Sequence, residues 1–135
     1  MNKLIVTGLL VLIVGLVGGC GAIPRTASEC RIECKKHLHF ESPYRFEDLH
    51  ENIASFLNKE FGHDFLGNST GWCVVKHLDK GIGEITVVSM FSRIDFVVDL
   101  QKLEDNKTSV DIYTEWYMDE GERATKLQQK CLNGF

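Results

Sequence analysis

The chain has 135 residues, of which 44% are hydrophobic and 25% charged, with 19 acidic and 15 basic side chains. This length allows a single domain that buries roughly two-thirds of the surface of its unfolded chain. The formal net charge of −4 argues against nucleic acid as a partner, because nonspecific binding to nucleic acid needs a basic surface.

The first nineteen residues have the pattern of an export signal. Met1 to Lys3 carries one positive charge, and Leu4 to Val17 is an almost continuous apolar run. A helix needs about 20 apolar residues to cross a bilayer, so this run is too short to span one by itself. The small residues Gly18 and Gly19 then precede Cys20, as the narrow site of a signal peptidase requires.

The sequence Val17-Gly18-Gly19-Cys20 resembles the lipobox of bacterial lipoproteins, and the resemblance covers residues 1–21. It implies cleavage before Cys20, lipid on the Cys20 sulfur and a place in the bacterial cell envelope, attached to a membrane. Residue 21 is Gly rather than Asp, so the inner-membrane retention signal of enterobacterial lipoproteins is missing. In an organism with two membranes we therefore expect the outer membrane, with the domain facing the periplasm. An ordinary secretory signal and an uncleaved helix extended to Ile23 are the alternatives.

This interpretation divides the chain into a signal peptide (1–19), a lipidated tether (20–29) and a single domain (30–135). The domain keeps four cysteines, and an even number in an exported domain predicts two disulfides among Cys30, Cys34, Cys73 and Cys131. Three pairings are open. We favour links from the first two cysteines to Cys73 and Cys131, because a Cys30–Cys34 bridge would leave the N-terminal segment untied.

A zinc site is the alternative use of the first two cysteines. Cys30, Cys34, His37 and His39 offer two thiolates and two imidazoles, which could bind Zn²⁺ tetrahedrally. The spacing fits no common zinc finger, and an oxidising compartment favours disulfides. We therefore expect no cofactor and no metal.

The first half of the domain predicts one long helix. Residues 30–41 could form a helical turn or an extended segment. Ser42-Pro43 is expected to cap and open a helix that ends at Gly62. Apolar residues recur at helical spacing, which indicates a core-facing stripe: Phe46, Leu49, Ile53, Phe56, Leu57 and Phe61. Residues 63–71 are rich in turn formers and are expected to be a loop.

The second half predicts strands at 72–78, 84–91, 94–101 and 110–116, because hydrophobic residues alternate there with period two. Placing Leu100 opposite Ile112 and Phe96 opposite Trp116 requires a three-residue loop, 105–107, with a bulge. A final helix starts at Asp119, turns Ala124, Leu127 and Cys131 inwards and ends at 133–134. The expected fold is α+β: an N-terminal helix, a three- to four-stranded antiparallel meander and a C-terminal helix, in two layers stapled by disulfides.

No catalytic motif stands out. Gly81-Ile82-Gly83 predicts a hairpin turn rather than a phosphate-binding loop, and no spacing gives His50, the pair His63-Asp64, or Asp95 and Asp99 a positioned catalytic partner. Asp95 and Asp99 alternate with core positions and are expected on a solvated face.

The sequence therefore favours a non-enzymatic envelope protein that binds another protein. A small apolar-ligand carrier, and a zinc-binding or hydrolytic protein, are the alternatives. If no helix covers the sheet face opposite Phe96 and Ile112, then Val97, Tyr113 and Tyr117 on that face are the best candidates for a partner surface.

Overall fold

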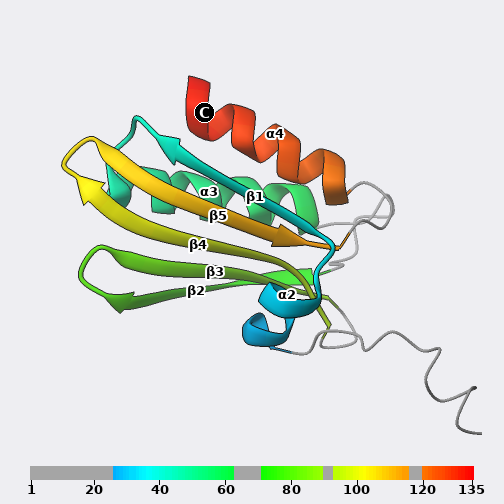
Figure 1. Ribbon diagram of the computed structural model, residues 1–135. Helices are drawn as coiled ribbons and strands as arrows, with labels where there is room; N and C mark the ends of the chain where they lie inside the picture. The colour runs from blue at the N-terminus through cyan, green and yellow to red at the C-terminus, as the bar shows by residue number, and fades with distance from the viewer. Residues whose placement is uncertain (1–25, 63–70, 90–92, 116–119) are drawn as a thin grey trace, which may run out of the picture.

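The computed structural model describes residues 26–62, 71–89, 93–115 and 120–135 (Figure 1). In chain order its elements are α2 (Ala27–Glu33), β1 (Lys36–Ser42), α3 (Phe46–Phe61), β2 (Gly71–Asp79), β3 (Ile82–Ser89), β4 (Ile94–Glu104), β5 (Lys107–Thr114) and α4 (Glu120–Asn133). None of the helices in these ranges is long and apolar enough to cross a membrane. The predicted signal peptide and Cys20 lie outside the described residues.

The five strands form one antiparallel sheet in the order β1-β5-β4-β3-β2. Strands β2 to β5 are the predicted meander, with four strands. Strand β1 is added beside β5, and α3 carries the chain from the β1 edge to the β2 edge (Figure 1). The predicted α+β class is confirmed, and the sheet has one strand more than expected.

Two helices cover one face of the sheet, so the main layers are the predicted two. Helix α3 packs on β2, β3 and β4, and α4 packs on β1 and β5 (Figure 1). The core between them contains fully buried side chains from both helices and from the three central strands, among them Ile53, Leu57, Phe96, Ile112 and Leu127. On the other face, the short helix α2 is the only described helix, and it packs on β4 and β5. We call this second face the open face.

The ambiguous segment 30–41 contains both predicted possibilities, a helix and then a strand. Helix α2 begins at Ala27, and the Thr26 hydroxyl accepts a hydrogen bond from the Glu29 amide at 3.1 Å. The end of the predicted tether, from Ala27 to Glu29, therefore belongs to α2. In β1, Leu38 and Phe40 pack against the core while the residues between them face the opposite way, as strand alternation dictates.

The prediction that Ser42 caps α3 is wrong. Ser42 is the last residue of β1 and is buried, and its hydroxyl donates a hydrogen bond to the Cys131 carbonyl at 2.6 Å. Helix α3 begins four residues later, after Arg45, which provides no side-chain cap. The Ser42 hydroxyl therefore connects β1 to α4 instead of starting a helix. The predicted end of α3 at Gly62 is confirmed.

The β4–β5 hairpin has a tighter turn than predicted. Leu100 lies opposite Val110 and Phe96 opposite Thr114, two residues away from the predicted register. The turn has two residues, 105 and 106, and the extra residue sits in β4, where the register shifts between Lys102 and Glu104. Because the shift is even, every side chain keeps its predicted face. The predicted inward stripe of α4 is confirmed, and Gly134 follows it with a φ of 106°.

Candidate functional site

A row of four charged residues and one histidine crosses the open face from edge to edge. Each of the five strands contributes one residue, and each residue lies directly opposite the next across the strand pairing. In order from β2 to β1 the residues are Lys76, Glu84, Asp99, Asp111 and His39. We call this set the charged row.

Three neighbouring members of the charged row are carboxylates. Glu84 opposes Asp99, and Asp99 opposes Asp111. Like charges directly across a strand pair destabilise a sheet, because their Cβ atoms lie only about 5 Å apart. Glu84 is also 7% exposed, so water screens it little. Lys76 lies opposite Glu84, 4.0 Å from its carboxylate, and a second positive charge comes from outside the sheet.

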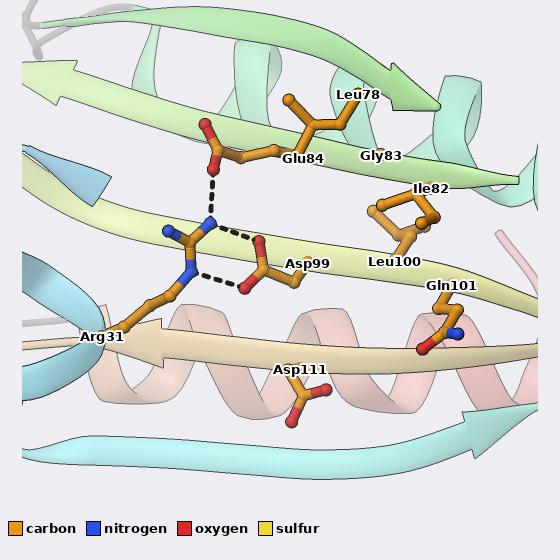
Figure 2. A pocket seen from close by; sticks show the side chains of 9 residues that line it. All are labelled: Arg31, Leu78, Ile82, Gly83, Glu84, Asp99, Leu100, Gln101 and Asp111. Atoms are coloured by element: carbon orange, nitrogen blue, oxygen red, sulfur yellow. Dashed lines mark hydrogen bonds and ion pairs between the residues drawn. The ribbon is translucent and has the colours of Figure 1, made fainter. Parts of the chain in front are cut away.

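Arg31 of α2 supplies that charge (Figure 2). Its Nε donates to Asp99 Oδ2 at 2.6 Å and its Nη2 to Asp99 Oδ1 at 2.6 Å, while Nη2 also donates to Glu84 Oε2. The first two bonds form a bidentate guanidinium–carboxylate pair, the strongest kind of side-chain ion pair. The Asp99 hydrogen bonds are the main reason why the pKa of Arg31 is held above its ordinary value, and partial burial opposes them.

Helix α2 holds Arg31 in this position through its neighbour Cys30. The Cys30 side chain is fully buried against Ile94 and Val97, and it forms a disulfide with Cys34, the C-terminal cap of α2. A helix of seven residues has little stability of its own. The buried cysteine and the Arg31 ion pairs therefore fix α2 on the sheet.

Asp111, the third carboxylate, has a different environment. His37 Nε2 lies 2.7 Å and His39 Nδ1 lies 3.0 Å from the same atom, Asp111 Oδ1. The His37 ring stacks on Tyr113 with a centroid distance of 4.3 Å and an interplanar angle of 6°. Partial burial raises the pKa of Tyr113, and the charges of Asp111 and Asp99 add to the effect. Within the described ranges, neither a guanidinium nor an ammonium group pairs with Asp111.

A hollow of about 370 Å³ lies over the middle of the charged row. Its floor includes the three carboxylates, and Arg31 reaches into it from α2 (Figure 2). Leu78 and Ile82, beside the β2–β3 turn, form part of its wall and are 58% and 38% exposed. The hollow is open to solvent and combines an acidic floor with exposed apolar side chains, so it can bind a cationic group that has an apolar neighbour.

The proposed zinc ligands do not form a metal site. Cys30 and Cys34 are bonded to each other, so their thiolates are not available as ligands, and both histidines contact Asp111. Among the residues that the structure describes, no three His, Cys, Asp or Glu side chains are arranged to hold a metal ion.

The favoured disulfide pairing is wrong, because the structure joins Cys30 to Cys34 and leaves Cys73 and Cys131 as thiols. Cys30 lies on the open face, whereas Cys73 and Cys131 pack against the core on the other side of the sheet. Cys73 belongs to the β2 edge, and Cys131 belongs to α4, which packs on β1 and β5. Strands β2 and β1 are four strand spacings apart, or about 19 Å. Cys73 and Cys131 therefore lie at opposite edges of the sheet, too far apart to form a disulfide.

Two residues of the predicted partner surface, Val97 and Tyr113, lie on the open face, but both are at least partly covered. Val97 is fully buried beneath α2, and Tyr113 is half-buried against His37. Tyr117 lies outside the described residues, as do His63 and Asp64. Asp99, predicted to be simply solvated, is an ion-paired member of the charged row. Strand alternation could have revealed the row of carboxylates, but no local signal could have placed Arg31 beside a residue 68 positions away.

No protein-family model matches the chain, and no similar sequence is found among curated proteins. The function must therefore be argued from the geometry of the open face.

Proposed function

We propose that the protein is a lipid-anchored, non-enzymatic component of the bacterial cell envelope that binds another protein through its open face. The charged row accepts a basic side chain of that partner, and the apolar wall of the hollow accepts a neighbouring apolar side chain. The observation that carries this proposal is the line of three opposed carboxylates, only two of which are paired with Arg31.

The charged row lowers the stability of the sheet, and this supports a binding role. A sheet that served only as a scaffold would gain stability from neutral or oppositely charged pairs at these positions. Asp111 in particular adds a third negative charge beside Asp99, and its ion-pair partners among the described residues are imidazole nitrogens. A partner's lysine or arginine placed over Asp111 would complete the pattern that Arg31 begins.

The same contacts favour binding over catalysis. Asp99 uses both carboxylate oxygens in its bonds to Arg31, and Glu84 is also bound to that guanidinium. Carboxylates fixed in this way are poor general bases, because a base must be free to accept a proton. An apolar-ligand carrier is also less well supported, since charged side chains line both this hollow and a second one between α3 and α4.

Attachment to the membrane rests on the likeness of residues 17–20 to a lipobox. The chain enters the domain at α2, which packs against the open face near the start of β4, whereas the β2–β3 and β4–β5 turns lie at the other end of the sheet (Figure 1). A tether attached at α2 would leave these turns and the hollow beside them accessible to a partner.

Site-specific photocross-linking in intact membranes tests the partner proposal. A photoreactive residue replaces Gln101, which is exposed and lines the hollow, and in a matched control it replaces Gln129, which is exposed on α4. We expect a discrete adduct from position 101 that is absent at position 129 and is lost when Asp111→Asn is added. The cross-linked partner peptide should contain lysine or arginine. Equal adducts from both positions, or an adduct that Asp111→Asn does not change, would contradict the proposal.

The anchor has its own test. The intact mass of protein extracted from membranes should lack residues 1–19 and include a diacylglycerol group, and Cys20→Ser should abolish both changes. A mass that retains Met1, or a mature protein without lipid, would rule out the anchor without affecting the open face.

A further inference from the structure

The two long helices form a second hollow on the other side of the sheet from the charged row. It has a volume of about 330 Å³ and is lined by side chains from both helices and by the last residue. We call it the helix groove and define it by Phe56, Lys59, Glu60, Lys126, Lys130 and Phe135. The groove plays no part in the proposed function.

Positive charge dominates the helix groove, although the chain as a whole is acidic. Lys126 pairs with Glu60 at 2.9 Å, so that pair is neutral. In the described part of the chain, neither Lys59 nor Lys130 has a carboxylate within 4.0 Å. The side chains that line the groove thus leave two ammonium charges unneutralised.

An apolar wall lies beside these lysines. The rings of Phe56 and Phe135 meet edge to face with a centroid distance of 6.3 Å, and Phe135 is 45% exposed. The Lys126 ammonium lies 5.7 Å from the centre of the Phe56 ring, close enough for a cation–π contact. Asn52 and Ser55 of α3 add polar groups to the lining of the groove. The groove therefore places polar and cationic groups next to an exposed aromatic surface.

From this arrangement we infer that the helix groove binds a phosphate ester whose apolar substituent lies against Phe56 and Phe135. A phosphate monoester carries a charge of about −1.5 to −2 at neutral pH, which matches the two unpaired ammonium groups. Lysine is a common phosphate ligand because its three donors can rotate to suit the phosphate oxygens. A hollow of this size lies at the lower end of the range for small-molecule sites, so the ligand is a small ester and not a polyanion.

Titration calorimetry of the full-length protein in detergent with phenyl phosphate tests this inference. We expect saturable one-to-one binding that weakens as the salt concentration rises. Lys59→Gln and Lys130→Gln should each weaken binding about tenfold, since each removes one charge-assisted contact. Lys80→Gln, the same change in the exposed β2–β3 turn, should have no effect.

Phe135→Ala separates the two halves of the site. It should weaken the binding of phenyl phosphate but leave the weaker binding of inorganic phosphate unchanged, because only the ester uses the aromatic wall. Competition shows whether the natural ester is a lipid headgroup or a soluble molecule. Micelles containing phosphatidylglycerol should displace phenyl phosphate if the ester is a lipid headgroup, and should fail to do so if it is a soluble ligand. Absence of saturable binding, or equal affinities in the Lys59→Gln, Lys130→Gln and Lys80→Gln proteins, would overturn the inference.

Discussion

At the scale of single side chains, Arg31 holds together two carboxylates that would otherwise repel each other. We expect Arg31→Met to lower the free energy of unfolding by about 2 kcal/mol, because it removes charge-assisted hydrogen bonds in a partly buried place. Lys126→Met breaks the exposed pair with Glu60 and should cost less than about 1 kcal/mol. Urea-induced unfolding of the two variants measures the difference.

A second substitution shows whether repulsion between Glu84 and Asp99 causes the loss of stability in Arg31→Met. Adding Asp99→Asn to Arg31→Met removes one of the two opposed charges and should restore part of the lost stability. If the double variant is less stable than the single one by the full cost of Asp99→Asn alone, the two residues are not coupled, and the role given to Arg31 is wrong.

His50 should make the stability of the fold depend on pH. Its ring is buried between Phe46 and His77, and the atom Nε2 has no hydrogen-bond partner among the described residues. Burial is the main cause that lowers the pKa of His50, and the nearby His77 lowers it further. The unfolded chain therefore takes up a proton at higher pH than the folded chain, so stability falls as pH drops below about 6.5, the ordinary pKa of histidine.

Urea unfolding at pH 7.5 and at pH 5 tests this dependence. The loss of stability between the two pH values should be smaller in His50→Gln, which cannot titrate at that position. An identical loss in both proteins would show that other groups determine the acid sensitivity.

At the scale of elements, the disulfide of α2 is a local link. It closes a loop of only a few residues, so in the chain-entropy model it contributes about 2 kcal/mol, less than a bridge between distant elements would. We expect mass spectrometry of the unreduced, denatured protein to show Cys30 linked to Cys34, and Cys73 and Cys131 both alkylated. In the native protein both thiols should react slowly, since burial raises the pKa of Cys73 to about 11 and that of Cys131 to about 12. A peptide that links Cys73 or Cys131 to another cysteine would contradict this pairing.

The contact between α3 and β3 depends on the absence of a side chain at residue 83. A Cβ atom on Gly83 would lie 2.5 Å from His50 Cδ2 and 3.2 Å from Phe46 Cζ. Gly83→Ala should therefore destabilise the protein by about 1–3 kcal/mol, the usual cost of overpacking. In a His50→Ala background the same change should cost much less, because the clashing ring is gone. Thermal unfolding of the four proteins completes this cycle, and equal costs in both backgrounds would exclude the steric explanation.

The sequence could predict those elements whose own pattern decides their structure. Helix α3 follows from apolar residues at helical spacing, and β2 to β5 follow from strict alternation. The exact pairing of β4 with β5 could not be predicted, because a bulge in β4 and a longer turn satisfy the same alternation. The position of Ser42 could not be predicted, because its hydroxyl bonds to Cys131, 89 residues further on, and no local pattern signals that contact.

At the scale of the whole molecule, the candidate site exists only because the sheet is assembled in one particular order. The charged row combines residues from all five strands. Arg31 joins it from α2, which precedes β1 in the chain. Alternation could predict which residues of β4 and β5 share the open face. The residues that form the centre of the candidate site could not be predicted, because they depend on the addition of β1 beside β5 and on the docking of α2.

This strand order also predicts an order of folding. Strand β1 pairs with residues that are 66 to 78 positions away, whereas β2 to β5 pair with their immediate neighbours in the chain. Closing the longer loop costs more entropy, so the meander should form before β1 docks. Pulse-labelling hydrogen exchange during refolding should protect the amides of β3 and β4 before those of β1, and simultaneous protection would contradict this order.

The place of β1 at the sheet edge beside β5 has a consequence for the newly made chain. Synthesis proceeds from the amino end, so β1 leaves the ribosome long before the strand that pairs with it. Until residue 114 has emerged, the unpaired edge groups of β1 and the side chains of Leu38 and Phe40 lack their native cover. This early segment therefore spends most of the synthesis of the chain without the strand that completes its hydrogen bonds.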